Sequence, residues 1–360
     1  MNLGIILIKK YIPKGEFSKN VLTLMTGTTI AQAIPVAISP ILTRLYTPED
    51  FGVAALYMAI ATIIGSVATA RYELAIMLPE KDDDALNIAA LGLYIATILS
   101  VFLLILVITF NQAICNLLNN DEISFWLYFL PFSVFFIGLF NVLQYYNNRK
   151  KQYRDIAKAN VYKAVTSAIV RLSVVFLKPG PTGLISGQIT SQIAANTKLL
   201  LNTIKNKNLK SIISKDNIKL LAKRYVDFPK YATPAVLANT SSYQLTNILI
   251  SSFYSVATLG YYSIVQRILG MPTTLIGNAI GQVFYQQASD EKIKTGKSLK
   301  TYKSTVKKLI FIGLPIFGTL IFFIEDIFVF VFGEEWRIAG KYAQILLPMF
   351  FIRFGKCPHQ

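Results

Sequence analysis

Two apolar segments of this chain carry cationic side chains at positions that a membrane-spanning helix would place in hydrocarbon. Residues 159–177 contain Lys163 and Arg171, and residues 257–286 contain Arg267. A charge at the centre of a bilayer costs at least about 2.5–3.5 kcal/mol, so these residues are candidates for function. The planar guanidinium of arginine matches the geometry of phosphate. The three cations therefore predict that an anion binds along a path through the membrane.

Each cation shares one helix face with neutral polar residues, at 100° per residue. In the first segment this face holds Asn160, Lys163, Ser167 and Arg171. In the second it holds Arg267, Thr274, Asn278 and Gln282. Pro272 interrupts the second face, which predicts either a bend used in gating or a static kink. For Lys163 the alternative is that its ammonium reaches the cytoplasmic interface.

Two further apolar segments carry amides and hydroxyls without charge. Residues 21–43 contain Gln32 and Ser39, and residues 183–201 contain Gln188 and Gln192. Such residues can line a path for sugars, and they can equally join helices within a membrane. Singly, each is better explained by helix contacts, whereas the four polar faces together favour a hydrophilic cavity.

Three charged residues lie at the expected ends of spans. Arg44 follows the first span on its outer side, where it is a candidate for an outer gate or an interface anchor. Arg71 and Glu73 lie at the inner end of the second span. We expect these two to form an ion pair or to bind lipid headgroups.

The sequence lacks the combinations of residues that most enzymes use for catalysis. The chain has one histidine, His359, and two cysteines, Cys115 and Cys357, which the expected topology places on opposite sides of the membrane. No metal-ligand spacing, no Ser/His/Asp set and no glycine-rich phosphate loop is present. We therefore expect no metal, no cofactor and no enzymatic activity.

The elements that must position these residues are apolar segments of membrane-spanning length. A bilayer core needs about 20 apolar residues per helix. Nine such segments are followed by a tenth that begins near residue 342, and the nine are 21–43, 53–70, 86–110, 123–144, 159–177, 183–201, 231–253, 257–286 and 305–332. The sequence predicts an all-α, polytopic membrane protein.

The formal charge of +17 follows this topology. With the N-terminus in the cytoplasm, 29 Lys and Arg residues fall on the inner side, 4 on the outer side and 3 within spans. Such an asymmetry fixes orientation by the positive-inside rule and favours anionic membrane lipid as a partner. A nucleic-acid partner is not expected, because no recognisable binding motif accompanies the charge.

A weak internal repeat divides the chain into two halves. Residues 45–52 and 253–260 each carry a tyrosine six residues before a glycine, at an offset of 208 residues. Both halves start on the same side, which predicts a parallel repeat. We expect an N-terminal lobe of six spans at 1–205, a basic cytoplasmic linker at 206–230, and an incomplete C-terminal lobe at 231–360. The offset implies a second half that reaches roughly residue 410, so we expect the chain to be truncated at its C-terminus.

Several segments resemble a known family. The run from Leu42 to Gly52, the run from Arg71 to Pro79, residues 267–272 and residues 347–354 are similar to those of polysaccharide biosynthesis flippases. These are the O-antigen and capsule repeat-unit flippases of the multidrug/oligosaccharidyl-lipid/polysaccharide exporter superfamily. The resemblance implies two helical lobes around a central cavity. It implies translocation of an undecaprenyl-pyrophosphate-linked oligosaccharide to the outer leaflet of the bacterial inner membrane by alternating access. It also implies an O-antigen polymerase and a chain-length regulator as partners.

Other functions remain open at the level of sequence. The same fold could serve an ion-coupled drug exporter or a flippase for a peptidoglycan precursor, and a truncated chain could be inactive. The basic charges within spans favour an anionic cargo over a cationic drug. A membrane polymerase is disfavoured because every expected outer loop is short.

Overall fold

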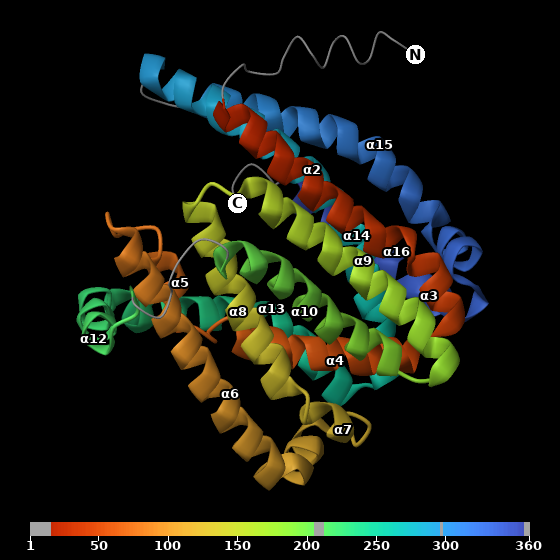
Figure 1. The fold of residues 1–360 in the computed structure, drawn as a ribbon. Helices are drawn as coiled ribbons and strands as arrows, with labels where there is room; N and C mark the ends of the chain where they lie inside the picture. Colours follow the sequence, from red (N-terminus) through yellow and green to blue (C-terminus); the bar gives the residue numbers. More distant parts are fainter. Residues whose placement is uncertain (1–15, 205–211, 296–297, 356–360) are drawn as a thin grey trace. The chain divides into compact units, whose positions relative to one another are not determined.

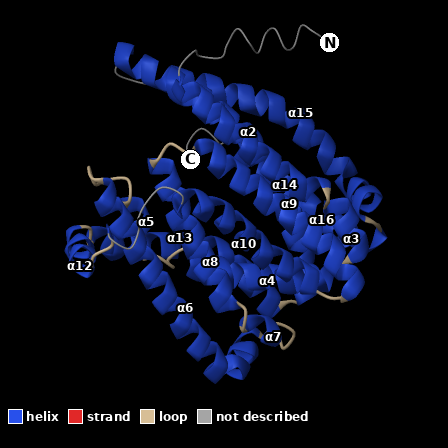
Figure 2. Cartoon of the chain, viewed as in Figure 1, coloured by secondary structure: helices blue, strands red, loops and turns tan. Residues whose placement is uncertain are grey.

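The computed structural model describes residues 16–204, 212–295 and 298–355. Within these ranges every regular element is a helix (Figure 1, Figure 2). Each apolar segment expected from the sequence is mainly helical in the structure, but segments 21–43 and 123–144 are each divided between two helices, and segment 53–70 runs past the helix end at Gly65. The predicted all-α fold is confirmed.

Four described helices are long and apolar enough to cross a membrane, judged by length and composition: α4 (Pro48–Gly65), α6 (Asp82–Leu118), α9 (Tyr153–Leu177) and α15 (Leu299–Phe332). At a rise of 1.5 Å per residue, even an 18-residue helix reaches about 27 Å. Large apolar side chains such as Phe102, Ile105 and Ile108 of α6 lie more than half exposed. An outward apolar face on a helix of this length fits contact with lipid rather than water. That the remaining predicted spans cross the membrane stays a prediction.

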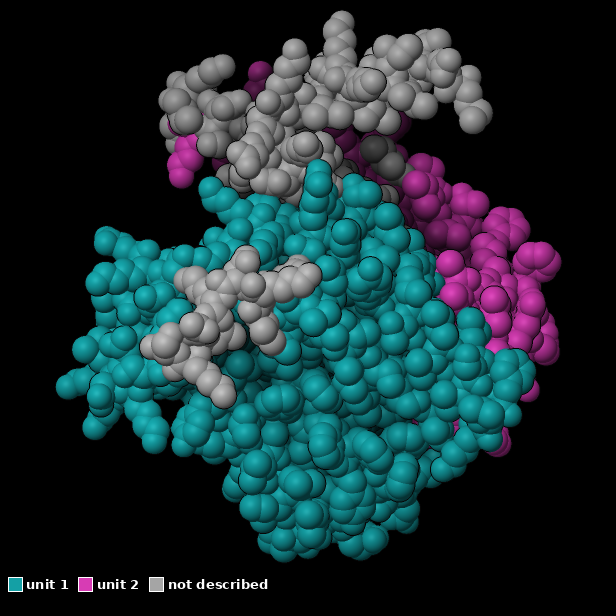
Figure 3. All heavy atoms as spheres, in the orientation of Figure 1, with its two compact units in different colours: residues 1–35, 56–178, 182–252 teal, residues 36–55, 179–181, 253–360 magenta. Residues whose placement is uncertain are grey.

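The chain forms two compact units (Figure 3). Unit 1 consists of residues 1–35, 56–178 and 182–252, and unit 2 consists of residues 36–55, 179–181 and 253–360. A short N-terminal segment thus packs with the C-terminal helices. The expected lobe boundaries at residues 205 and 231 stay a prediction.

Unit 1 is a bundle in which α9 packs along its successor α10 (Thr182–Ile204). Helix α8 (Leu130–Arg149) packs against both α6 and α10. The other helices of this unit are α2 (Glu16–Ala37), α5 (Tyr72–Ala75), α7 (Ser124–Leu127), α12 (Lys215–Arg224), η1 (Phe228–Ala232) and α13 (Thr233–Phe253). The last part of α4 also belongs to unit 1.

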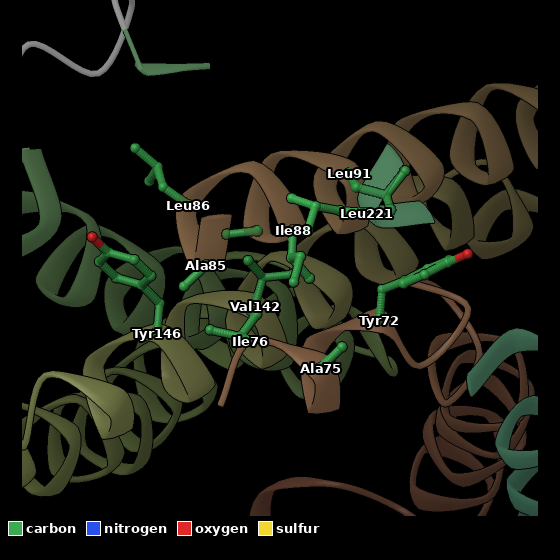
Figure 4. Packing of buried hydrophobic residues seen from close by; sticks show 11 residues of the cluster. Tyr72, Ala75, Ile76, Ala85, Leu86, Ile88, Leu91, Val142, Tyr146 and Leu221 are labelled. Atoms are coloured by element: carbon green, nitrogen blue, oxygen red, sulfur yellow. The ribbon is translucent and has the colours of Figure 1, made fainter. Parts of the chain in front are cut away.

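A buried apolar cluster holds α5 against the start of α6, and Figure 4 shows its side chains. Ile76, just after α5, and Ile88 of α6 are fully buried, and Leu221 of α12 is 2% exposed. The hydroxyl of Tyr72 donates to the carbonyl of Ala222 at 2.9 Å. Helix α12, which belongs to the segment expected to be a linker, is therefore fixed to the body of unit 1.

Asn87 holds the chain that leads into α12. Its Nδ2 donates to the carbonyl of Ile212 at 3.1 Å, and its Oδ1 accepts from the amide of Ser214 at 2.9 Å. Asn87 is completely buried. One side chain thus bonds a backbone donor and a backbone acceptor of the segment that leads into α12.

Two basic residues at the end of α8 bind the start of α6. Arg149 Nε lies 3.1 Å from Asp82 Oδ1, and the same guanidinium donates to the carbonyls of Ile76 and Glu80. Lys150 also pairs with Asp82. The last residue of α8 is thereby joined to the connection between α5 and α6.

Unit 2 contains α3 (Ser39–Leu45), the first turns of α4, α14 (Val256–Thr295), α15, η2 (Glu334–Trp336) and α16 (Arg337–Gly355). Helix α16 packs against both α14 and α15. At the turn before α16, Arg337 binds both carboxylate oxygens of Glu334, at 2.6 and 3.0 Å, and Glu325 at 3.2 Å. This hydrogen bonding lowers the pKa of the Glu334 carboxyl.

We predict that Asn87→Ala loosens the attachment of α12. The substitution leaves the amide of Ser214 and the carbonyl of Ile212 without their partner, at a cost of about 1–3 kcal/mol. Limited proteolysis of the purified protein between residues 205 and 230 should become at least several-fold faster. The control is Asn116→Ala, an exposed asparagine on the same helix. Equal cleavage rates in the two variants would contradict the role of Asn87.

Candidate functional site

The two cations of α9 lie partly inside unit 1. Lys163 points its ammonium at the ring of Phe140 in α8, 4.9 Å from the ring centre. This contact satisfies the charge by a cation–π interaction within the bundle. Asn160, on the same expected face, is half-buried.

Arg171 lies against α10 at a position where that helix has no side chain. A Cβ placed on Gly187 would lie 2.7 Å from Arg171 Cγ and 3.2 Å from the carbonyl of Ser167. Any larger residue at 187 would therefore displace the arginine or separate the two helices. The absence of a side chain at Gly187 makes room for a half-buried arginine on an apolar helix.

The polar face of α10 divides into structural and available groups. Asn196 donates to the carbonyl of Phe136 at 2.9 Å and so joins α10 to α8. Gln192 is 5% exposed, and its Oε1 has no hydrogen-bond partner among the described residues. Gln188 is half-buried and contributes its carbonyl to the hydroxyl of Ser191. Gln192 and Asn196 thus each retain a side-chain oxygen that has no hydrogen-bond partner among the described residues.

Arg71 and Glu73, at the start of α5, form an ion pair inside the protein. Arg71 Nη1 lies 2.9 Å from Glu73 Oε1, and the hydroxyl of Thr69 donates to the other carboxylate oxygen. Glu73 is 1% exposed. Ala70 and Arg71 both adopt positive φ, 48° and 61°, so the chain makes a tight turn that brings the arginine back to the carboxylate. The predicted ion pair is present, and a role in gating stays a prediction.

The remaining candidates of the first segment differ in exposure. Gln32 of α2 is half-buried, Ser39 of α3 is buried, and Arg44 at the end of α3 is exposed. The exposed position of Arg44 agrees with either of its expected roles.

In unit 2 the central cation is Arg267 of α14. The residue is half-buried, and its Nη1 is buried with no hydrogen-bond partner among the described residues. A buried guanidinium without a partner is costly, so an anion that approached it would gain a charge-assisted bond. The side chains of Pro272, Asn278 and Gln282 lie outside the described residues.

The two repeated turns of the sequence meet each other in unit 2. A Cβ on Gly52 of α4 would lie 1.9 Å from the carbonyl oxygen of Val256, the first residue of α14. A Cβ on Gly260 of α14 would lie 1.8 Å from the carbonyl oxygen of Pro48, the first residue of α4. Each glycine therefore lies against the first residue of the other helix. The two contacts are related by the offset of 208 residues.

Trp336 lies beside this crossing. The residue is completely buried, and its Nε1 donates to the carbonyl of Thr43 at 2.9 Å. Its ring packs edge-on against Phe51 and Tyr261, with centroid distances of 5.2 and 5.8 Å. One tryptophan thus joins α3, α4, α14 and the turn before α16.

The sequence did not indicate the contact between the two turns or the contacts of Trp336. The repeated tyrosine and glycine marked both turns, but a repeat does not show that its copies touch. Trp336, Asn87 and Gly187 carried no signal beyond residue type. Within the described residues, no group of three or more His, Cys, Asp or Glu side chains could hold a metal ion.

Comparison with solved structures places this geometry among membrane transporters. The chain resembles an inward-facing multidrug resistance MATE family transporter of the MOP superfamily, with a TM-score of 0.55 and 14% identity over 90% of this chain and 76% of that one. It resembles a eukaryotic MATE transporter with a TM-score of 0.53 and 14% identity over 94% and 78%. It resembles a MATE transporter in complex with MaL6 with a TM-score of 0.51 and 15% identity over 92% of this chain and 78% of that one. The fold is that of a multi-pass membrane transporter.

The family model for polysaccharide biosynthesis proteins matches residues 41–340. The chain belongs to this family. No curated protein sequence matches the chain. The predicted resemblance is thereby confirmed at the level of family and fold.

We predict that Glu73→Ala lowers the free energy of unfolding by about 3 kcal/mol, because removal of one partner leaves the other charge in a poorly solvated site. Reversible unfolding in mild detergent would measure this change, with Glu122→Ala at an exposed position as the control. The double substitution of Arg71 and Glu73 by alanine should cost less than the sum of the single changes. Additive costs would argue against a coupled pair.

We predict that Gly52→Ala and Gly260→Ala each destabilise the protein by roughly 1–3 kcal/mol, since the added methyl must push two backbones apart. The melting temperature in detergent is the measurement. The control is Gly318→Ala in α15, where an added Cβ meets nothing within 4 Å. There the change should be neutral or slightly stabilising. An unchanged melting temperature for Gly52→Ala would contradict the close crossing.

Proposed function

We propose that the chain is a flippase for undecaprenyl-pyrophosphate-linked oligosaccharide repeat units of O-antigen or capsule. It moves them from the cytoplasmic to the outer leaflet of the bacterial inner membrane, as a transporter and not as an enzyme. The observation that carries the proposal is the partly buried arginine in each unit of a transporter of the polysaccharide biosynthesis family, Arg171 and Arg267. The N-terminus then lies in the cytoplasm, and the polymerase and chain-length regulator are the expected partners.

The pyrophosphate explains why arginine is used. A pyrophosphate diester carries two negative charges, and its transfer into hydrocarbon is prohibitive unless cations replace its water. Arg267 offers a buried Nη1 with an open donor, and Arg171 is held on α10 by the space at Gly187. Lys163 is the weaker candidate of the three, because its ammonium already contacts Phe140.

The sugar needs hydrogen-bonding groups rather than charge. Gln192 supports this role through its open acceptor, and Asn196 also keeps an open Oδ1 while its Nδ2 donates to the carbonyl of Phe136. We assign the same role to the other polar residues expected along the path, namely Gln32, Ser39, Asn160, Gln188, Asn278 and Gln282. Amides that are buried and incompletely bonded are suited to exchange partners with a passing hydroxyl.

Alternating access requires a contact that opens and closes at each side of the membrane. The crossing of Gly52 and Gly260 is suited to the outer gate, because it lies in the two expected outer turns and involves no covalent or charged link. Trp336 would stabilise the closed state through its bond to Thr43. In this scheme Arg44 lies beside the outer gate, Pro272 lets α14 bend, and the ion pair of Arg71 with Glu73 lies at the inner side.

A multidrug exporter is the second candidate, because the solved structures of similar fold include multidrug resistance transporters. A cationic drug would need an acid that is free to bind it. Two acids next to predicted spans are paired, Glu73 with Arg71 and Glu325 with Arg337, and their neighbour Asp326 is exposed. This pairing favours the anionic cargo. A peptidoglycan-precursor flippase shares the pyrophosphate and is distinguished by complementation.

The test is a deletion of the gene in its host, with complementation by plasmid-borne variants. Loss of the protein should leave lipid-linked oligosaccharides on the cytoplasmic leaflet and remove surface polysaccharide. We predict that Arg171→Ala and Arg267→Ala reduce transport at least about tenfold, because each loses a charge-assisted bond worth about 1.5–3 kcal/mol. The lysine variants should keep part of the activity.

The matched control is Arg154→Ala, an exposed arginine on the same helix as Arg171. It should transport as the natural protein does at equal abundance. Normal transport by Arg171→Ala and Arg267→Ala would overturn the anionic path. Normal surface polysaccharide in the deletion strain, with rescue of a peptidoglycan-flippase mutant instead, would reassign the cargo.

A further inference from the structure

Helix α12 is attached to the first turns of α6. Its Leu221 packs in the cluster that includes Ala85, Ile88 and Leu91 of α6. These residues form the first turns of a helix whose apolar run is long enough to cross the bilayer. A helix fixed to the polar end of a membrane-spanning segment lies next to the lipid headgroups. Figure 1 shows α12 beside the start of α6.

The outward face of α12 carries a stripe of lysines. Lys215, Lys219 and Lys223 follow one another at four-residue spacing, so they share one face of the helix. All three are exposed, and none forms an ion pair within the part of the chain that the structure describes. The stripe points away from the face that carries Leu221, because residue 221 is about 160° from Lys219 at 100° per residue.

Apolar and aromatic side chains accompany the lysines. Leu220 is 61% exposed beside the stripe, and Tyr231 after the helix is also 61% exposed. Lys230 lies over the ring of Tyr231 at 5.0 Å, and Arg224 lies over the ring of Tyr225 at 5.5 Å. Exposed leucine between basic residues, followed by tyrosines, is the composition of helices that lie in the headgroup layer.

We propose that α12 binds the anionic phospholipid headgroups of the leaflet next to it, with the lysine stripe on the phosphates and Leu220 in the acyl boundary. Charge complementarity selects this occupant. Residues 215–230 carry five basic and two acidic side chains, and the membrane that the chain spans is the nearest surface able to offer negative charge. The proposal needs only the membrane fold, so it stands whatever the cargo.

The fixed attachment gives the lipid contact a definite consequence. Because Asn87 and Tyr72 hold α12 to unit 1, lipid bound to the stripe is bound to the body of that unit and not to a loose tether. Anionic lipid would then oppose any movement that lifts this end of unit 1 out of the headgroup layer.

The test uses the full chain with Leu220→Cys and Cys357→Ser, labelled at residue 220 with bimane and placed in lipid nanodiscs. The other cysteine, Cys115, is buried. Emission should shift to the blue as phosphatidylglycerol replaces phosphatidylcholine, and salt should weaken the shift. With Lys215, Lys219 and Lys223 all changed to Gln, the blue shift at a given share of phosphatidylglycerol should fall by at least about half. Glutamine keeps the helix propensity of lysine.

The control changes three other exposed basic residues, Lys151, Arg154 and Lys158, to Gln, with the same loss of charge. It should leave the shift at residue 220 unchanged. An emission that is the same in both lipids, or the same with and without the stripe, would overturn the proposal. So would an equal shift in phosphatidylcholine discs after addition of inorganic phosphate or a short RNA, because the ligand would then be a soluble anion.

Discussion

Hydrocarbon offers no water to a backbone amide, and this constraint decides which structures the chain can adopt. Every peptide group in an apolar segment must find its partner within that segment, so the segment becomes a helix. Once helices have formed, apolar surface gains little from leaving lipid for another helix, and close contact between backbones becomes the main attraction. Gly187 against the carbonyl of Ser167 and Gly52 against the carbonyl of Val256 are such contacts.

The same absence of water governs the charges. Near the ends of helices the structure pairs them: Arg71 with Glu73, Arg149 with Asp82, and Arg337 with Glu325. These pairs fix turns and connections, and their charges are neutralised within the protein. Arg267 is different, because its buried Nη1 has no partner within the described residues. A buried Nη1 with no hydrogen-bond partner among the described residues is the feature that most favours an anionic cargo.

Periodicity and hydropathy were enough to predict the helices, because a membrane span is a local property of about twenty residues. The ion pair of Arg71 with Glu73 was also predictable, since its members are two positions apart. What could not be predicted are contacts between distant residues. Asn87 reaches residues 212 and 214, and Trp336 reaches Thr43, and no local pattern specifies either pairing. The hydrogen bond from Asn196 of α10 to the carbonyl of Phe136 in α8 likewise depends on a neighbour in another helix.

The crossing of the two repeated turns shows what a duplicated sequence must preserve. A contact between two equivalent copies is self-complementary, so whatever the first copy presents to the second, the second presents to the first. Glycine is required at both 52 and 260, because each receives a backbone carbonyl at a distance that excludes any Cβ. The residues that supply those carbonyls, Pro48 and Val256, have unrelated side chains, and in both contacts the atom nearest the glycine is the backbone oxygen. Positions 52 and 260 must therefore both be glycine, whereas positions 48 and 256 can differ in residue type. A weak sequence repeat can for this reason maintain a close structural one.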